Sequence, residues 1–199
     1  EDMPDDIVGF VGGPPCQSWS LAGAMRGIND PRGKVFYEYI RLLEAKKPLF
    51  FLAENVAGIV STAHITEFHK ILESFEKVGY NISYKLVNAM DYNVPQERKR
   101  VIVVGYRKDL GKKFVFPEPS GKVITLKQVI GSLPEPLAVG TNASKTKADM
   151  LDIPNHEHMI GSFSTIYMSR NRKKKWDESS FTIQAGARHA PLHPDANPM

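Results

Sequence analysis

Residues 7–16 read IVGFVGGPPC and decide the expected fold, because an apolar run leads directly into a short, stiff loop. The apolar run Ile7–Val11 is typical of a buried strand. Pro14 and Pro15 each fix φ, so the loop can stay rigid without a hydrogen-bonded neighbour. Cys16 is the single cysteine of the chain, and a rigid loop would give such a nucleophile a preset direction of attack. A lone cysteine is commonly a buried packing residue instead, and this stretch alone leaves both interpretations open.

The following hundred residues alternate between strand-like and helix-like patterns. Apolar residues recur at helical spacing over 35–43 and 65–78, and Gly79 is a plausible stop signal after the second segment. Short apolar runs predict further strands at Leu49–Ala53, Ile82–Val87 and Val101–Tyr106. Strands separated by helices of this length predict an α/β fold with a parallel, Rossmann-like sheet.

The pattern changes after residue 107. Beyond it Pro, Gly, Lys and Asn are frequent, apolar periodicity is weak, and Phe163–Met168 and Phe181–Gln184 are short β-like pieces. We therefore expect a catalytic core over residues 1–107 and an irregular, mostly β region over residues 108–199.

Composition excludes several classes of protein. With 42% apolar and 24% charged residues the chain resembles an ordinary globular protein, and no apolar run is long enough to cross a bilayer. One cysteine excludes an internal disulfide framework and a multi-cysteine zinc site, so we expect no metal centre. A free thiol fits a reducing compartment, which predicts a cytoplasmic protein. The net charge of +4 includes five bases within Arg170–Lys175, which favours an acidic partner.

Two polar motifs lie at the carboxyl ends of predicted strands, where ligands of open α/β sheets gather. The first surrounds Cys16, and the second is Glu54-Asn55-Val56, directly after the apolar residues LFFLA. A carboxylate in that position is costly unless it works in a site or caps a helix, and both explanations remain for Glu54.

A third motif opens the strand predicted at Val101. Its alternation places Gln96, Arg98 and Arg100 on one face if the segment is extended. The alternative is a solvated strand edge whose basic side chains prevent pairing with other strands.

A thiol, a carboxyl group and guanidinium groups together suit one type of reaction. A thiolate can add to C6 of a pyrimidine when an acid protonates or hydrogen-bonds N3, and C5 then becomes able to take a methyl group. Guanidinium groups can hold the base carbonyl and neighbouring phosphates.

These motifs resemble those of the cytosine-C5 DNA methyltransferases in order and spacing, over roughly residues 7–106: GGPPCQSWS, DPRGKVFYEYIRLL, FFLAENV and VPQERKRVIVVGYR. The later segments IPNHEH, SFSTIYMSRNRKKKW, FTIQAGAR and LHP resemble the target-recognition region of GGCC-specific, HaeIII-type bacterial modification methylases. The resemblance implies a sheet that binds S-adenosylmethionine, double-stranded DNA as partner, and a restriction–modification role. The target cytosine would have to flip out of the duplex.

The resemblance also implies a role for each matching catalytic residue. Cys16 would be the covalent nucleophile on C6. Glu54 would contact N3 and the exocyclic amine, while Arg98 and Arg100 would bind O2 and the flanking backbone.

Other matching positions would serve the cofactor and the DNA. Pro15 and Val35 would line the S-adenosylmethionine pocket. Gln17 and Ser20 would shape a mobile loop over Ser18–Arg32 that closes on DNA, with Arg32 among its contacts.

For reading the sequence of the DNA we select Arg170, Arg172 and Arg188, because arginine recognises guanine O6 and N7 bidentately. Lys173 and the two lysines after it would meet phosphates, unless this run is a solvated basic turn. Gln96 is a further expected DNA contact.

The chain lacks the family's Phe-x-Gly-x-Gly cofactor motif and its closing Gly-Asn-x-Val motif. It therefore resembles the middle of a longer methylase, expected as a monomer completed by N- and C-terminal segments of the same enzyme. Two alternatives stay open: a tRNA cytosine-C5 methyltransferase with the same catalytic motifs, or a catalytically silent DNA-binding fragment.

Overall fold

The computed structural model describes residues 3–4, 6–14, 35–134, 137–139, 157–159, 173–183 and 193–195. The chain divides into two compact units. Unit 1 comprises Glu1–Asn88 and Lys99–Glu118, and unit 2 comprises Ala89–Arg98 and Pro119–Met199. The functional division between residues 1–107 and 108–199 stays a prediction.

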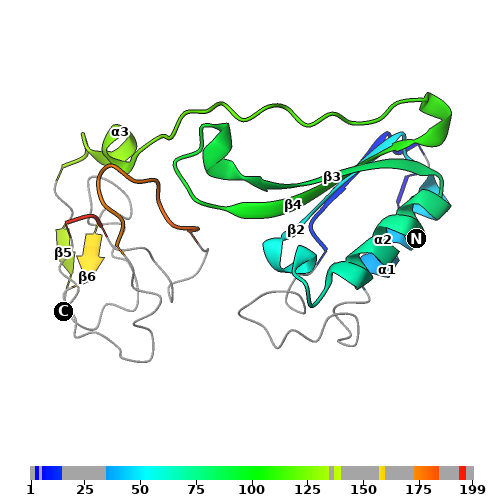
Figure 1. Ribbon diagram of the computed structural model, residues 1–199, viewed down its shortest axis with the longest axis horizontal. Helices are drawn as coiled ribbons and strands as arrows, with labels where there is room; N and C mark the ends of the chain where they lie inside the picture. Colours follow the sequence, from blue (N-terminus) through cyan, green and yellow to red (C-terminus); the bar gives the residue numbers. More distant parts are fainter. Residues whose placement is uncertain are drawn as a thin grey trace. The chain divides into compact units, whose positions relative to one another are not determined.

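Unit 1 is built on a four-stranded sheet in the order β1-β2-β4-β3 (Figure 1). Its strands are β1 (Gly9–Gly12), β2 (Phe50–Val56), β3 (Tyr80–Asn88) and β4 (Lys99–Arg107). β1 lies parallel to β2, whereas β4 is antiparallel to both β2 and β3.

All four strands form where apolar runs predict them, but the expectation of an all-parallel sheet is wrong for β4. Residues 89–98 join β3 to β4 and contain no α-helix, only the 3-10 turn η3 (Ala89–Tyr92) and a single bridge residue, Gln96. A parallel connection needs a crossover of a dozen or more residues, so this short link makes the pair antiparallel.

Two helices lie beside each other on one face of the sheet (Figure 1). They are α1 (Val35–Lys46) and α2 (Ile65–Lys77), close to their predicted bounds, and η2 (Ala57–Val60) follows β2. The buried side chains of α2 are Phe68, Ile71, Leu72 and Phe75, which is the spacing of a single helical stripe. Gly79 adopts φ +102° just after α2, a conformation that ends helices and suits glycine.

Aromatic rings fill the core between these layers. The Phe75 ring lies 4.5 Å from Phe51 and 6.1 Å from Phe36, centroid to centroid. The Tyr80 hydroxyl donates to the Pro48 carbonyl at 2.9 Å, and burial raises the pKa of Tyr80 to about 12. These contacts bury large apolar areas, the main stabilising contribution to such a fold.

The packing of the core leaves no room for a side chain at position 105. Gly105 pairs with Phe51 across β4 and β2, and the Phe51 ring lies where a side chain at 105 would stand. Any larger residue would displace the ring from its packed position.

The described part of unit 2 has few regular elements. They are α3 (Leu126–Ile130) and the parallel pair β5 (Leu137–Val139) and β6 (Glu157–Met159). Thr125 and Gln128 form a capping box at the start of α3. The expected β-like piece at residues 181–184 is wrong for 181–183, which belong to no strand, while its neighbour Ser180 bridges Gln96. The piece expected at 163–168 lies outside the described residues.

None of the helices in the described ranges combines the length and apolar character that crossing a membrane requires.

Candidate functional site

Glu54 and Arg100 form an ion pair on the sheet of unit 1. Arg100 pairs with Val56 in the β2–β4 register, so Glu54 is its diagonal neighbour on the same face. Arg100 Nε lies 2.6 Å from Glu54 Oε1, with the side chains 21% and 37% exposed respectively. The pairing holds the carboxylate in one orientation at the surface of the sheet.

β2 extends through this motif, whereas the sequence predicts its end at Ala53. Residues 54–56 continue the ladder opposite 100–102 of β4. Because side chains alternate along a strand, Glu54 leaves the core face while Asn55 points into it and is 2% exposed.

Asn55 connects this motif to the chain that follows β1. Its Nδ2 donates to the Pro14 carbonyl at 3.3 Å, and its Oδ1 accepts from the Val56 N–H at 2.9 Å. A Cβ added to Gly13 would lie 3.4 Å from Glu54 Oε2. The backbone at residues 13–14 thus passes directly beside Glu54, two residues before Cys16 in the sequence.

This proximity follows from the parallel pairing of β1 and β2. Both strands run toward the same edge of the sheet, and β1 ends at Gly12 opposite Ala53, so the chain after β1 passes beside the last residues of the β2 ladder, 54–56. Open α/β sheets bind their ligands at such edges. The structure therefore brings together Glu54, Arg100 and the residues that lead to the cysteine.

Several predicted site residues lie outside the described residues: Cys16, Pro15, Gln17, Ser20, Arg32, Arg170, Arg172 and Arg188. Val35 opens α1, but its side chain is likewise not described. Their roles stay predictions.

The other predicted motif residues lie in unit 2. The N–H of Glu97 donates to Ser180 at 2.8 Å, and the N–H of Ser180 donates to Pro95 at 2.9 Å. The Arg98 carbonyl accepts from the Ala89 N–H at 3.0 Å. Gln96 and Arg98 therefore lie on a segment with fixed backbone partners.

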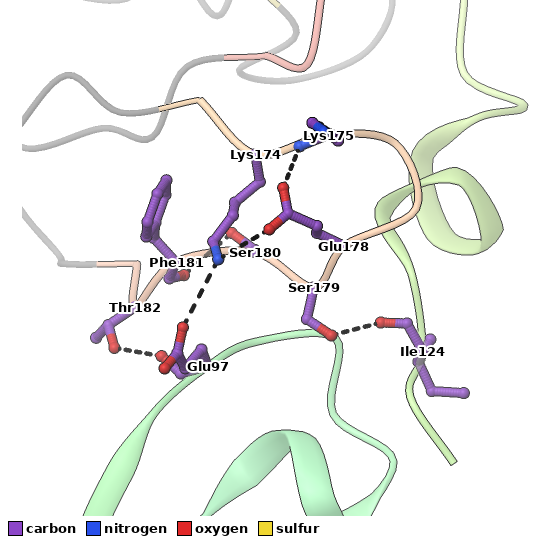
Figure 2. A network of polar contacts seen from close by, with 9 residues as sticks. All are labelled: Glu97, Ile124, Lys174, Lys175, Glu178, Ser179, Ser180, Phe181 and Thr182. Carbon is purple, nitrogen blue, oxygen red and sulfur yellow. Dashed lines mark hydrogen bonds and ion pairs between the residues drawn. The ribbon is translucent and has the colours of Figure 1, made fainter.

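The three lysines Lys173–Lys175 differ in their exposure to solvent. Lys173 and Lys175 are exposed, in keeping with the expected phosphate contacts, which stay a prediction. Lys174 instead points between two carboxylates, Glu97 and Glu178 (Figure 2).

Two residues have supporting contacts that the sequence did not predict: Asn55 had no role of its own, and Lys174 was expected to meet a phosphate. Asn55 carries a recognisable signal, since a polar residue within an apolar strand must find buried partners. Lys174 carries no such signal in the sequence, because nothing in a run of three lysines distinguishes the partly buried one from its neighbours.

The chain is similar in sequence to known methyltransferases. The type II methyltransferase M.MthTI of Methanothermobacter thermautotrophicus is 60% identical over 194 residues, which cover 98% of this chain and 58% of that protein. The type II methyltransferase M.NgoPII of Neisseria gonorrhoeae is 49% identical over 203 residues, covering 100% of this chain and 59% of that protein. The chain thus spans somewhat more than half the length of these curated relatives.

Solved structures share the fold. The crystal structure of a protein encoded within an E. coli prophage aligns with a TM-score of 0.66 at 23% identity, covering 97% of this chain and 65% of that one. The Entamoeba histolytica methyltransferase EhMeth aligns with a TM-score of 0.57 at 17% identity, covering 96% and 57%. The family model for C-5 cytosine-specific DNA methylases matches residues 1–197. With that match over nearly its whole length, the chain belongs to the C-5 cytosine-specific DNA methylase family.

Proposed function

We propose that this chain carries the catalytic centre of a DNA cytosine-C5 methyltransferase of the restriction–modification type. The observation that carries the proposal is the Glu54–Arg100 ion pair beside the backbone of residues 13–14, which leads to Cys16. Nucleophile, acid and cation would then meet at one sheet edge, as the reaction requires.

In this proposal the Cys16 thiolate forms a bond to C6 of the flipped cytosine. Glu54 contacts N3 and accepts a hydrogen bond from the exocyclic amine, and a proton shared between its carboxyl group and N3 stabilises the negative charge that develops on the ring when the thiolate adds. The electron pair of the C5–C6 bond makes C5 nucleophilic. Once C5 carries the methyl group, a solvent-derived base takes the C5 proton, and the electron pair of that C–H bond re-forms the C5–C6 double bond and expels the Cys16 thiolate.

S-adenosylmethionine supplies the methyl group when it is bound. Pro15 and Val35 are the proposed contacts, on the strength of the sequence resemblance. Gly13 supports a close approach of a planar base, because its missing side chain leaves Glu54 Oε2 uncovered on that side.

The proposed target is a cytosine within GGCC, and the family resemblance suggests the inner one. Arg170, Arg172 and Arg188 would read the guanines, and Lys173 would contact a phosphate. The type II methyltransferases among the relatives support DNA as substrate, and no observation favours tRNA.

The test uses a duplex with 5-fluorocytosine in GGCC, S-adenosylmethionine and the complete protein. Fluorine cannot leave C5 as a proton does, so the covalent adduct persists and mass spectrometry finds it on Cys16. The Cys16→Ser variant should form no adduct; if it forms as much as the wild type, Cys16 is not the nucleophile.

Glu54→Gln tests the role of the Glu54 carboxyl group in a methyl-transfer assay with an unmodified GGCC duplex. The rate of methyl transfer should fall by about 10²- to 10⁴-fold, the usual contribution of a general acid or base. Glu38→Gln is the matched control, because Glu38 also pairs with an arginine, Arg41 at 2.8 Å, but on the exposed surface of α1. Equal rates for the two variants would remove Glu54 from the reaction.

Arg172→Ala tests the reading of the sequence. Discrimination between GGCC and a site with one altered base should fall by about 1–3 kcal/mol in competition binding. A uniform loss of affinity for all sequences would make Arg172 a phosphate contact instead.

A further inference from the structure

We propose that Lys174 is a positioning residue for Arg98 and acts through Glu97. The inference rests on the proposed function, because it assumes that Arg98 contacts O2 of the target cytosine or the flanking backbone, the role that the sequence resemblance implies. All contacts that support it lie within unit 2.

The first observation is that residues 173–183 hold every polar group of Glu97. Its N–H donates to the Ser180 carbonyl at 2.8 Å, and its carbonyl accepts from Thr182 Oγ1 at 2.7 Å. Its carboxylate lies 3.7 Å from Lys174 Nζ. Figure 2 shows the Lys174 and Thr182 contacts converging on Glu97 from the same segment.

The second observation is the environment of Lys174. Its Nζ also lies 3.3 Å from Glu178 Oε1 and 4.8 Å from the centre of the Phe181 ring. Only 21% of the side chain is exposed. Two carboxylates and an aromatic face thus surround this ammonium group, an arrangement that orients it within the protein rather than toward a phosphate.

The third observation is the position of Arg98 in the chain. It directly follows Glu97, and its own carbonyl accepts from the Ala89 N–H at 3.0 Å. The backbone is therefore held by hydrogen bonds on both sides of the Arg98 Cα. The Arg98 side chain thus starts from a fixed point of the backbone.

A small displacement of the backbone at Arg98 would matter for the reaction. Partly exposed ion pairs contribute little to stability, so losing the Lys174–Glu97 contact should leave the fold intact. A misplacement of about 1 Å at a reacting centre can nevertheless cost about 100-fold in rate. We therefore expect Lys174 to affect turnover much more than DNA affinity.

The competing role for Lys174 is the one that the sequence alone predicts, a phosphate contact. Losing one such contact weakens DNA binding and lowers the slope of log affinity against log salt by about 1. Because Lys175 is exposed and adjacent in sequence, it is the matched control for that effect.

The experiment compares Lys174→Met, Lys174→Arg and Lys175→Met in the complete protein. Methionine keeps an unbranched side chain of similar length and removes the charge, whereas arginine keeps the charge. Lys174→Met should lower kcat about tenfold with an unchanged salt slope of DNA binding, and Lys174→Arg should restore most of the rate. Lys175→Met should lower the salt slope by about 1 and serves as the reference for the loss of a phosphate contact.

Glu97→Gln completes the test. If Lys174 acts through Glu97, the double variant Lys174→Met/Glu97→Gln should be no slower than the slower single variant. Additive losses would overturn the inference, as would a Lys174→Met variant with normal kcat and a lowered salt slope.

A structural measurement separates this inference from the proposed function. Lys174→Met should speed amide hydrogen exchange at residues 96–98, and Lys175→Met should not. Faster exchange in a protein that never methylates cytosine would refute the proposed function alone. Unchanged exchange in an active enzyme would refute the positioning role alone.

Discussion

In unit 1, Phe51, Phe68 and Phe75 are completely buried between the sheet and its helices, whereas the buried residues in the described part of unit 2 are two serines and a proline. Ser179 donates to the Ile124 carbonyl at 2.8 Å, and the backbone of Ser180 exchanges hydrogen bonds with the segment before Arg98. Apolar burial therefore dominates the first unit, while directed polar contacts hold the described part of the second. Mutations should separate these two kinds of stabilisation.

The largest difference should come from a core aromatic residue. Phe75→Ala removes a ring that contacts Phe36 and Phe51, so the free energy of unfolding should fall by about 3–5 kcal/mol. Urea unfolding followed by circular dichroism measures the loss. Val129→Ala, at an exposed position on α3 of unit 2, is the control and should change stability by less than about 0.5 kcal/mol. Similar losses for both would contradict the contrast between the units.

A smaller effect should follow from Tyr80→Phe, which leaves the buried Pro48 carbonyl without its donor and should cost about 1–2 kcal/mol. The same change tests a pH effect. Burial raises the pKa of Tyr80 from 10.0 to about 12, so its neutral form is favoured in the folded state. This stabilisation is complete below pH 10 and is lost as the pH rises toward 12.

Denaturant unfolding between pH 9 and 12 should therefore show a shallower loss of stability for Tyr80→Phe than for the wild type. Tyr37→Phe, at an exposed position on α1, should follow the wild-type curve. Parallel curves for wild type and Tyr80→Phe would show that this hydroxyl does not titrate as proposed.

The smallest effect should be a local one in unit 2. The Lys175 N–H donates to Glu178 Oε2 at 2.8 Å and, with Lys174, holds the pKa of Glu178 below its usual range. The charged form is thus favoured in the folded state, and its stabilisation is lost as the pH falls through that lowered pKa.

Amide exchange at Lys175, corrected for intrinsic rates, should accelerate at acid pH and should be fast at all pH values in Glu178→Ala, which has no side-chain acceptor. Strand amides of β2 should show neither change. If Lys175 stays protected in Glu178→Ala, the carboxylate does not hold this turn.

The same contrast explains how much the sequence could predict. The strands and helices of unit 1 were predictable because their apolar residues recur with regular spacing, as on α2. The direction of β4 was not, since spacing does not reveal that the link over residues 89–98 lacks a crossover helix. The sequence also places the end of β2 too early, at Ala53. The charged residue Glu54 suggests the end of an apolar strand, but the backbone pairing with β4 continues to Val56.

The candidate site shows the same limit. Glu54 and Arg100 could be named from their motifs, yet their ion pair depends on the antiparallel register of β2 and β4. The contacts of Lys174 depend on a segment far away in sequence and have no periodic signature. Local patterns identify reactive residues, whereas their supporting contacts require the fold.

The hydrogen bond from Thr182 to the Glu97 carbonyl joins residues 85 positions apart, which has a consequence for synthesis on the ribosome. The strands of unit 1 can pair once β4 has emerged, but Glu97 has to wait for residues 173–183. At about 5–20 residues per second this delay lasts roughly 4 to 17 s. A nascent chain would therefore hold a folded sheet before the segment carrying Arg98 acquires its partners, and competence for catalysis would come late, together with the region expected to read DNA.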